Sequence, residues 1–163
     1  MTSVRKKRVK YGEGQWFAVP LTGNRYALGV IVRGSYRKHG GLGYFFGPPR
    51  AEVPNDQATW LLSPRDAVMI GWFGDLGIVE GRWPLVASTR PFRREDWPIP
   101  RFGNPDTATH GWLTEYAQHS DSSDQPIRRE YVRIAELSAL PEDGVWGYLA
   151  VENWLSSLFT RPS

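Results

Sequence analysis

The chain has 163 residues, which suit one domain of ordinary size, and it carries 20 Lys and Arg against 17 Asp and Glu. It contains no cysteine, which excludes disulfides, thiolate metal sites and a cysteine nucleophile. No stretch approaches the roughly 18 apolar residues of a membrane span, and polar residues follow the charged start where a signal peptide would have an apolar core. These features predict a cytoplasmic protein that makes no membrane contact.

The positive charge is concentrated at the start of the chain. Residues 1–10 hold five cations and no acid, which leaves 15 cations against 17 acids, a formal charge of −2, for the rest. We therefore expect residues 1–10 to form a basic, disordered tail and residues 11–163 to form a single domain. A basic tail could also touch nucleic acid or an acidic partner.

Short segments rich in aromatic and β-branched residues predict strands in the first half of the chain. We expect these strands over residues 15–19, 26–33, 42–46, 68–73 and 83–87. Pro48 and Pro49 should end the third strand, because proline cannot donate a ladder hydrogen bond. A short helix should follow Pro54 and run to Leu62, with Asn55 or Asp56 as its N-cap.

The second half begins with a segment, residues 90–106, in which four prolines prevent regular structure over most of its length. Its large apolar residues should pin it to the core as an ordered loop: Phe92, Trp97, Ile99 and Phe102. Strands are expected over 111–116 and 131–137, separated by a polar, mobile loop at 118–125. The final helix should open near Asp143, its expected cap, with an apolar stripe that includes Leu149 and Leu155.

About seven short strands and two helices, in no alternating order, predict an α+β fold with a strongly curved antiparallel sheet. The glycine-rich start and the glycine-interrupted second strand suggest, by analogy of pattern, an SH3-like half-barrel at the N-terminus.

Catalytic and cofactor motifs are nearly absent. The glycines of segment 41–47 are spaced one residue too widely for a dinucleotide fingerprint and are followed by prolines, so they predict room for a strand bend. The histidines, His39, His110 and His119, show no metal-binding spacing. Asp75 lies between two glycines, where we expect it to accept hydrogen bonds from backbone amides in a turn. We expect a protein that is not an enzyme and holds no cofactor or metal.

Several motifs, in their order along the chain, resemble the immunity protein 26 family of bacterial polymorphic toxin systems. They are the opening Gly12–Leu21, then Gly43–Pro49, Phe73–Ile78 and Gly81–Pro84. The resemblance covers roughly residues 14–112 and, more loosely, the C-terminal helix. It implies a small non-enzymatic protein that binds and silences a toxin domain made by a neighbouring gene. It supplies no residues to carry over as a site.

In a cytoplasmic immunity protein, the toxin would act in the cytosol, where many toxins are nucleases with basic clefts. Acidic loops are the matching surface, because they steer association with such a cleft. The candidate partner-binding residues are Asp121 and Asp124 in one loop and Glu142 and Asp143 in another. The expected mechanism is occlusion, in which a rigid scaffold presents a loop-built patch that covers the active site of the toxin.

The alternative is a small nucleic-acid-binding or ribonuclease-like β-barrel that uses the tail and the Arg33–Lys38 region for phosphate contacts. Arg33, Tyr36, Arg37 and Lys38 come nearest to the pattern of aromatic residues interleaved with cations. The formal charge of −2 outside the tail disfavours nucleic acid as a partner, and the lack of a convergent base, acid and cation cluster disfavours catalysis.

Overall fold

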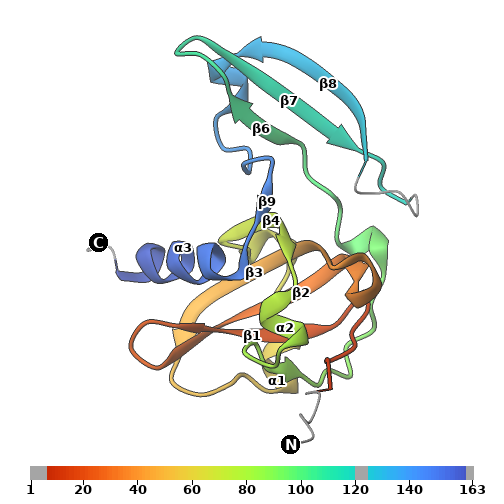
Figure 1. Ribbon diagram of the computed structural model, residues 1–163, viewed down its shortest axis with the longest axis vertical. Coiled ribbons are helices and arrows are strands. Elements are labelled where there is room, and N and C mark those ends of the chain that lie inside the picture. Colours follow the sequence, from red (N-terminus) through yellow and green to blue (C-terminus); the bar gives the residue numbers. More distant parts are fainter. Residues whose placement is uncertain (1–6, 120–124, 161–163) are drawn as a thin grey trace, which may run out of the picture.

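The computed structural model describes residues 7–119 and 125–160, which form a mixed α+β protein (Figure 1). A six-stranded sheet has the order β5-β1-β2-β3-β4-β9, and a separate three-stranded sheet has the order β6-β7-β8. The larger sheet contains β1 (Trp16–Leu21), β2 (Arg25–Ser35), β3 (Gly40–Arg50), β4 (Met69–Gly74), β5 (Leu85–Val86) and β9 (Val145–Trp146). The smaller contains β6 (Phe102–Pro105), β7 (His110–Tyr116) and β8 (Pro126–Arg133). The α-helices are α1 (Asp56–Trp60), α2 (Leu76–Val79) and α3 (Tyr148–Thr160).

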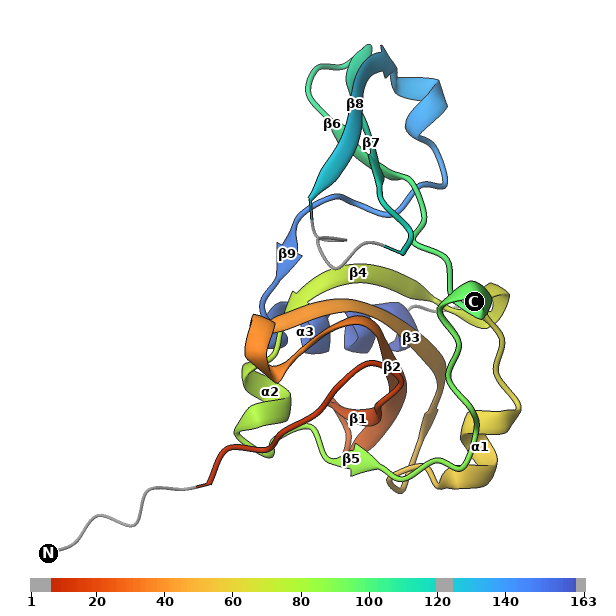
Figure 2. The ribbon, with the colours of Figure 1, turned by 90° about the vertical axis from the view of Figure 1, so that its right-hand side faces the viewer.

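The α+β class predicted from the sequence is confirmed. The larger sheet curves strongly around the molecule without closing into a barrel (Figure 2). Its pairings are antiparallel except for β9, which runs parallel to β4 and was not predicted. A third helix, α2, also forms where only a turn was expected.

The larger sheet is apolar on both faces. On β1, Trp16 and Ala18 pack into one cluster while Phe17 and Val19 pack into the other, as strand alternation requires. The same alternation continues along β2 and β3. A sheet covered on both faces explains why its strands appear in the sequence as nearly continuous apolar runs.

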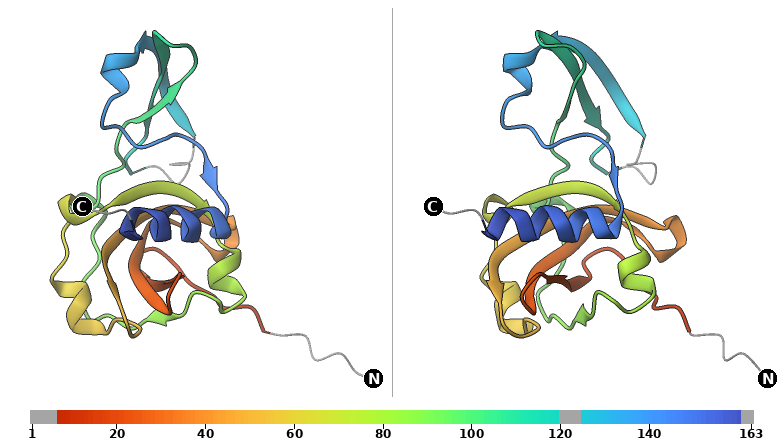
Figure 3. Two further views of the ribbon diagram at one scale, coloured as in Figure 1. Left: turned by 90° about the vertical axis from the view of Figure 1, so that its left-hand side faces the viewer. Right: turned by 60° about the vertical axis from the view of Figure 1, so that its left-hand side comes forward.

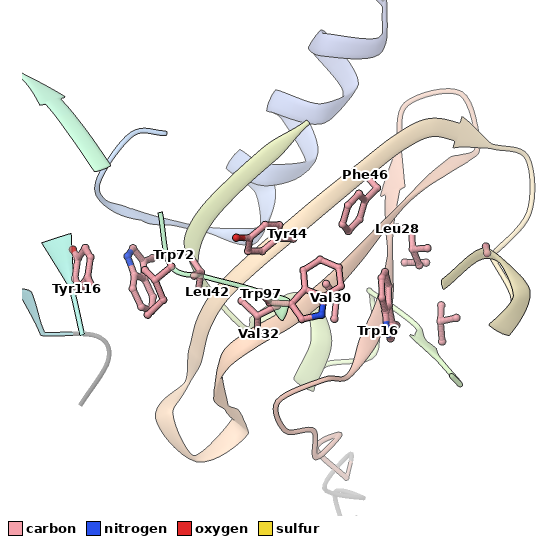
Figure 4. Close-up of a cluster of buried hydrophobic side chains, with 14 of the residues drawn as sticks. Trp16, Leu28, Val30, Val32, Leu42, Tyr44, Phe46, Trp72, Trp97 and Tyr116 are labelled. Carbon is pink, nitrogen blue, oxygen red and sulfur yellow. The ribbon is translucent and has the colours of Figure 1, made fainter. Parts of the chain in front are cut away.

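The proline-rich segment covers one face of this sheet, as predicted. The ring of Trp97 lies 5.9 Å from that of Trp16, 5.2 Å from that of Tyr44 and 6.1 Å from that of Phe46, measured between centroids (Figure 4). Ile99 and the ring of Trp97 are buried in the same cluster. The side chains of this segment thus cover the core. Its prolines, which lack a backbone N–H, remove few hydrogen bonds from the sheets.

The other face is covered by α3 and by the turn that carries Trp83 (Figure 3). Trp83 stacks on Phe17 at 5.5 Å and on Phe73 at 5.8 Å, and its indole N–H donates to the carboxylate of Glu152 at 3.0 Å. Arg82 completes the link with a bidentate ion pair to Glu152. A strand face, a loop and the C-terminal helix are therefore joined at one tryptophan.

Several predicted strand boundaries are wrong, and the strand expected over residues 83–87 is only Leu85–Val86. β3 continues through Pro48 and Pro49 to Arg50, which pairs with Tyr26 after a register shift. The prolines are tolerated because β4 pairs with β3 only as far as Phe45, and the shift in register relieves the ladder on the other side. β8 spans Pro126–Arg133 and not residues 131–137; its exposed, charged first half gave no apolar alternation to recognise.

Glycines open β3 after its turn from β2, and Gly41 is the first glycine of the segment that was predicted to need backbone room. Gly40 has φ of +133°, and a Cβ on Gly41 would collide with the backbone oxygen of Arg33. These glycines provide the backbone room that the sequence suggested.

The last helix begins at Tyr148, so Asp143 is not its cap. Between them, Gly144 has φ of +150° and β9 adds its two residues to β4. The buried face of α3 holds Val151, Glu152 and Leu155, while Leu149, expected in the apolar stripe, is exposed.

Asp75 has a structural partner other than the predicted backbone amides. It precedes α2 without capping it through its side chain, is buried, and accepts a hydrogen bond from the Tyr11 hydroxyl at 2.9 Å. Burial is the main cause that raises the pKa of Tyr11, and the hydrogen bond to Asp75 adds to it. Nearby, the backbone N–H of Val9 donates to the Val79 oxygen at 3.0 Å. The division into a tail over 1–10 and a domain over 11–163 stays a prediction, and residues 1–6 lie outside the described part.

Residues 102–119 and 125–137, here called the arm, form the smaller sheet. They stand away from the other described residues, here called the body (Figures 1 and 2). At its base, the ring centroid of Phe102 lies 6.2 Å from that of Trp72 of β4. The ring centroid of Tyr116 lies 5.1 Å from that of Trp72, and both of these rings are seen in Figure 4. The Tyr116 hydroxyl also donates to Asp143 at 2.7 Å. Aromatic packing and hydrogen bonds, including one from Arg33 Nε to the Gln118 oxygen at 3.1 Å, thus set the position of the arm.

We expect the Tyr44→Phe variant to lose less of its free energy of unfolding at alkaline pH than the wild type does. Tyr44 is buried and donates its hydroxyl to the Pro98 oxygen, and burial raises its pKa to about 12. Because the folded pKa exceeds the usual value of about 10, the stabilisation is complete below about pH 10 and is lost as the pH rises through 12. Urea unfolding from about pH 9 to about pH 12 measures this. If the free energy of unfolding of Tyr44→Phe fell above about pH 10 as steeply as that of the wild type and of a Tyr148→Phe control, the assignment would be contradicted.

Candidate protein-binding surface

The four acidic residues predicted to bind a partner have different settings. Asp121 and Asp124 lie outside the described residues. Glu142 and Asp143 lie on the segment that returns from the arm to the body. Glu142 is exposed, and Asp143 accepts a hydrogen bond from the Tyr116 hydroxyl. The backbone N–H of Asp143 also donates to the Gly103 oxygen at 3.2 Å. The structure therefore places Glu142 and Asp143 at the base of the arm, and their role in binding stays a prediction.

The arm has two unlike faces. Leu113, Val132 and Leu137 form a small core on one face, which the 3₁₀ helix at Ile134–Leu137 covers. The cross-strand register places Trp112 opposite Tyr131 and His110 opposite Arg133 on the other face. On the outer half of this second face, His110 and Trp112 are partly exposed, and Arg129 and Tyr131 are exposed.

The outer half of this face carries a cluster of aromatic rings and one arginine, which we call the arm patch. Its members are His110, Trp112, Arg129 and Tyr131. The Tyr131 ring lies 4.9 Å from that of Trp112 and 5.5 Å from that of His110. The Arg129 guanidinium lies 4.8 Å from the Trp112 ring centre, within cation–π distance. Tyr131 also donates its hydroxyl to Asp106 at 3.0 Å, which fixes the ring.

Sequence reasoning missed the arm patch, because its two halves lie on strands whose pairing register was unknown. The alternation of His110 with Trp112 and of Arg129 with Tyr131 is the only local signal. Such alternation places each pair on one side of a strand, but not on the same face of one sheet. An exposed patch of Trp, Tyr and Arg has the composition enriched in the energetic centres of protein interfaces.

The positions proposed for phosphate contact are less suitable than the sequence suggested. Arg33 is only 2% exposed and donates through Nη1 to the Val32 oxygen at 2.6 Å and through Nε to the Gln118 oxygen at 3.1 Å. Burial lowers its pKa, and the nearby Arg94 lowers it further. Arg37 is exposed and donates to the Tyr36 hydroxyl at 3.2 Å. Because Arg33 is buried, it cannot belong to an exposed row of cationic side chains on β2.

A groove of about 430 Å³ lies between the start of β4 and the segment that precedes β9. It is lined by apolar side chains that include Met69, Leu140 and Trp154, with Glu142 among the lining residues. Over residues 7–119 and 125–160, no group of three or more His, Asp or Glu side chains could hold a metal ion. Within the same ranges, no helix has the length and apolar character needed to cross a membrane.

Comparison with known proteins gives one match. The model of the family "Immunity protein 26" (Imm26) matches residues 12–112, which is more than half of the chain. Searches of curated proteins and of solved structures each find no match. The matched region contains the body strands β1 to β5 and the proline-rich segment, and it ends within β7 of the arm. The chain belongs to the immunity protein 26 family.

Proposed function

We propose that this chain neutralises a cognate toxin domain that acts in the cytosol, by binding the toxin and covering its active site. The observation that carries the proposal is the family match over residues 12–112, since immunity proteins protect the cell from a toxin. The scaffold suits occlusion, because a body with two packed faces supports an arm that stands clear of it (Figure 1). No enzymatic step is needed, and we expect the chain alone to hydrolyse neither RNA, DNA nor nicotinamide dinucleotides.

Co-expression tests the proposal. The toxin domain encoded beside the gene of this chain is produced from an inducible promoter, with and without this chain. We expect growth to be restored only when this chain is present, and the two proteins to elute together as a one-to-one complex. An interface of standard size, about 1,200–2,000 Å² of total buried area, suffices for such a complex. Equal growth arrest with and without the chain would refute the proposal.

The acidic residues Asp121, Asp124, Glu142 and Asp143 are proposed to steer the association of the toxin with this chain. Reversing the charge at Asp121 and Asp124 together, to Lys, should slow association more than it speeds dissociation, because rim charges act mainly over long range. The slowing should shrink near 1 M salt, where the Debye length is about 3 Å. Surface plasmon resonance across a salt series measures both rates.

A matched control makes the same change in charge on the body. Glu52 and Glu80 are exposed acids far from the arm in the sequence, and their double reversal to Lys alters the net charge equally. If both double variants slow association to the same degree, net charge is responsible and Asp121 and Asp124 have no special place. An unchanged association rate would locate the interface elsewhere.

A further inference from the structure

The arm patch lies outside the two packing contacts described for the arm. The opposite face of the arm has its own small core, and the base of the arm has its own contact with the body. Neither explains why Trp112 and Tyr131 are paired on the outer half, where Tyr131 is 45% exposed. Aromatic side chains that remain accessible together on an element that projects from the protein are typical of an interaction site.

We propose that the arm patch is the anchor of the complex with the toxin domain, a proposal that rests on the proposed function above. The aromatic pair Trp112 and Tyr131 receives an apolar side chain of the toxin. Arg129, held across Trp112, receives a toxin carboxylate beside it. The partner is therefore a protein surface on which an apolar side chain has an acidic neighbour.

The geometry lowers the entropic cost of binding. The Tyr131 hydroxyl is hydrogen-bonded to Asp106, and its ring is flanked by those of His110 and Trp112. Arg129 is already placed over an aromatic ring before a partner arrives. Ordering flexible side chains at an interface costs free energy, so a patch ordered in advance binds more tightly than a loose one.

Charge favours a protein partner over a nucleic acid. The described arm residues, 102–119 and 125–137, carry three arginines and four acids. Nucleic-acid surfaces that stack bases on aromatic rings also need a positively charged groove along the phosphate backbone. The described residues of the arm have stacking groups but no excess of positive charge, and one of the acids, Asp106, accepts the hydrogen bond from Tyr131 of the patch.

Neighbouring arginines of β8 provide a matched test, because successive side chains of a strand point to opposite faces. Arg129 pairs in register with Thr114 on the face of the patch, whereas Arg128 pairs with Glu115 and bonds Glu130 at 2.8 Å on the other face. Arg129→Glu should raise the Kd for the toxin domain at least about 30-fold, as at an energetic centre of an interface. Arg128→Glu, with the same change in charge, should alter the Kd less than about threefold.

Trp112→Ala tests the aromatic part, with Trp60→Ala as its control. Trp60 lies on α1 of the body and is 51% exposed, whereas Trp112 is partly buried. Trp112→Ala should weaken binding at least about 30-fold while Trp60→Ala leaves it unchanged. Far-ultraviolet circular dichroism and the melting temperature show whether each variant is folded. If Trp112→Ala does not fold, Arg129→Glu still tests the proposal, because Arg129 is exposed.

The measured quantity is the Kd for the toxin domain of the adjacent gene, from calorimetric titration of the full chain. Equal Kd values for Arg129→Glu, Arg128→Glu and the wild type would overturn the anchor while leaving the proposed function intact. Absence of any binding by the wild type would instead refute the proposed function. Tighter binding of a single-stranded RNA, or self-association abolished by Arg129→Glu, would also overturn the assignment of the patch to the toxin.

Discussion

Trp83→Ala should lower the free energy of unfolding by about 3–5 kcal/mol, the cost typical of removing a buried Trp or Phe side chain. Trp83 is 1% exposed and stacks on Phe17 and Phe73, so its loss opens a cavity between the sheet and α3. It also leaves the buried carboxylate of Glu152 without the indole donor. For a domain of this size each kcal/mol lowers the melting temperature by about 2–4 °C, so a decrease near 10 °C is expected.

Two further variants separate the contributions at this position. Trp83→Phe keeps an aromatic ring against Phe17 but removes the hydrogen bond to Glu152, so its effect should lie between those of the wild type and Trp83→Ala. Trp60→Ala removes an exposed tryptophan and should change the melting temperature by only a few degrees. Thermal melts followed by circular dichroism compare all three. Equal melting temperatures for Trp83→Ala and Trp60→Ala would contradict the packing described here.

Phe102→Ala should loosen the arm without unfolding the body. Phe102 is fully buried between Trp72 and Tyr116, and removing it costs about 3–5 kcal/mol at the contact that sets the position of the arm. Because opening can be local, hydrogen exchange should speed up in β7 far more than in β2. Binding of the toxin domain should weaken as well, since the arm patch is then held less firmly.

Ile127→Ala is the matched control, because Ile127 lies on the arm but is 67% exposed. It should leave exchange in β7 and binding of the toxin close to those of the wild type. Hydrogen exchange followed by mass spectrometry reads each strand separately. Uniform loss of protection in β2 and β7 on Phe102→Ala would show that arm and body unfold as one unit.

Local patterns were enough to predict most of the body. The apolar runs of β1, β2 and β4 and the turn glycines were recognised correctly, and Asn55 caps α1 by accepting from the Ala58 N–H at 3.3 Å. The aromatic residues of the proline-rich segment were also correctly placed against the core. Each of these features depends on neighbours in the sequence or on burial alone.

The arm depended on information that the sequence does not display. β8 is exposed along most of its length, so it lacks the apolar alternation by which strands are recognised. The pairing of Trp112 with Tyr131 joins residues 19 positions apart, and a shift of one residue would have placed them on opposite faces. The bond between Asp143 and Tyr116 is equally long-range, and it gives a structural partner to a residue selected only for charge and expected exposure.

The central claim is that this chain silences a toxin by binding it, and titration of toxin activity tests this most directly. The purified toxin domain of the adjacent gene is assayed at fixed concentration while the full chain is added. We predict that activity falls linearly to zero and reaches it at one molecule of chain per molecule of toxin. Full toxin activity in the presence of a large molar excess of folded chain would contradict the claim.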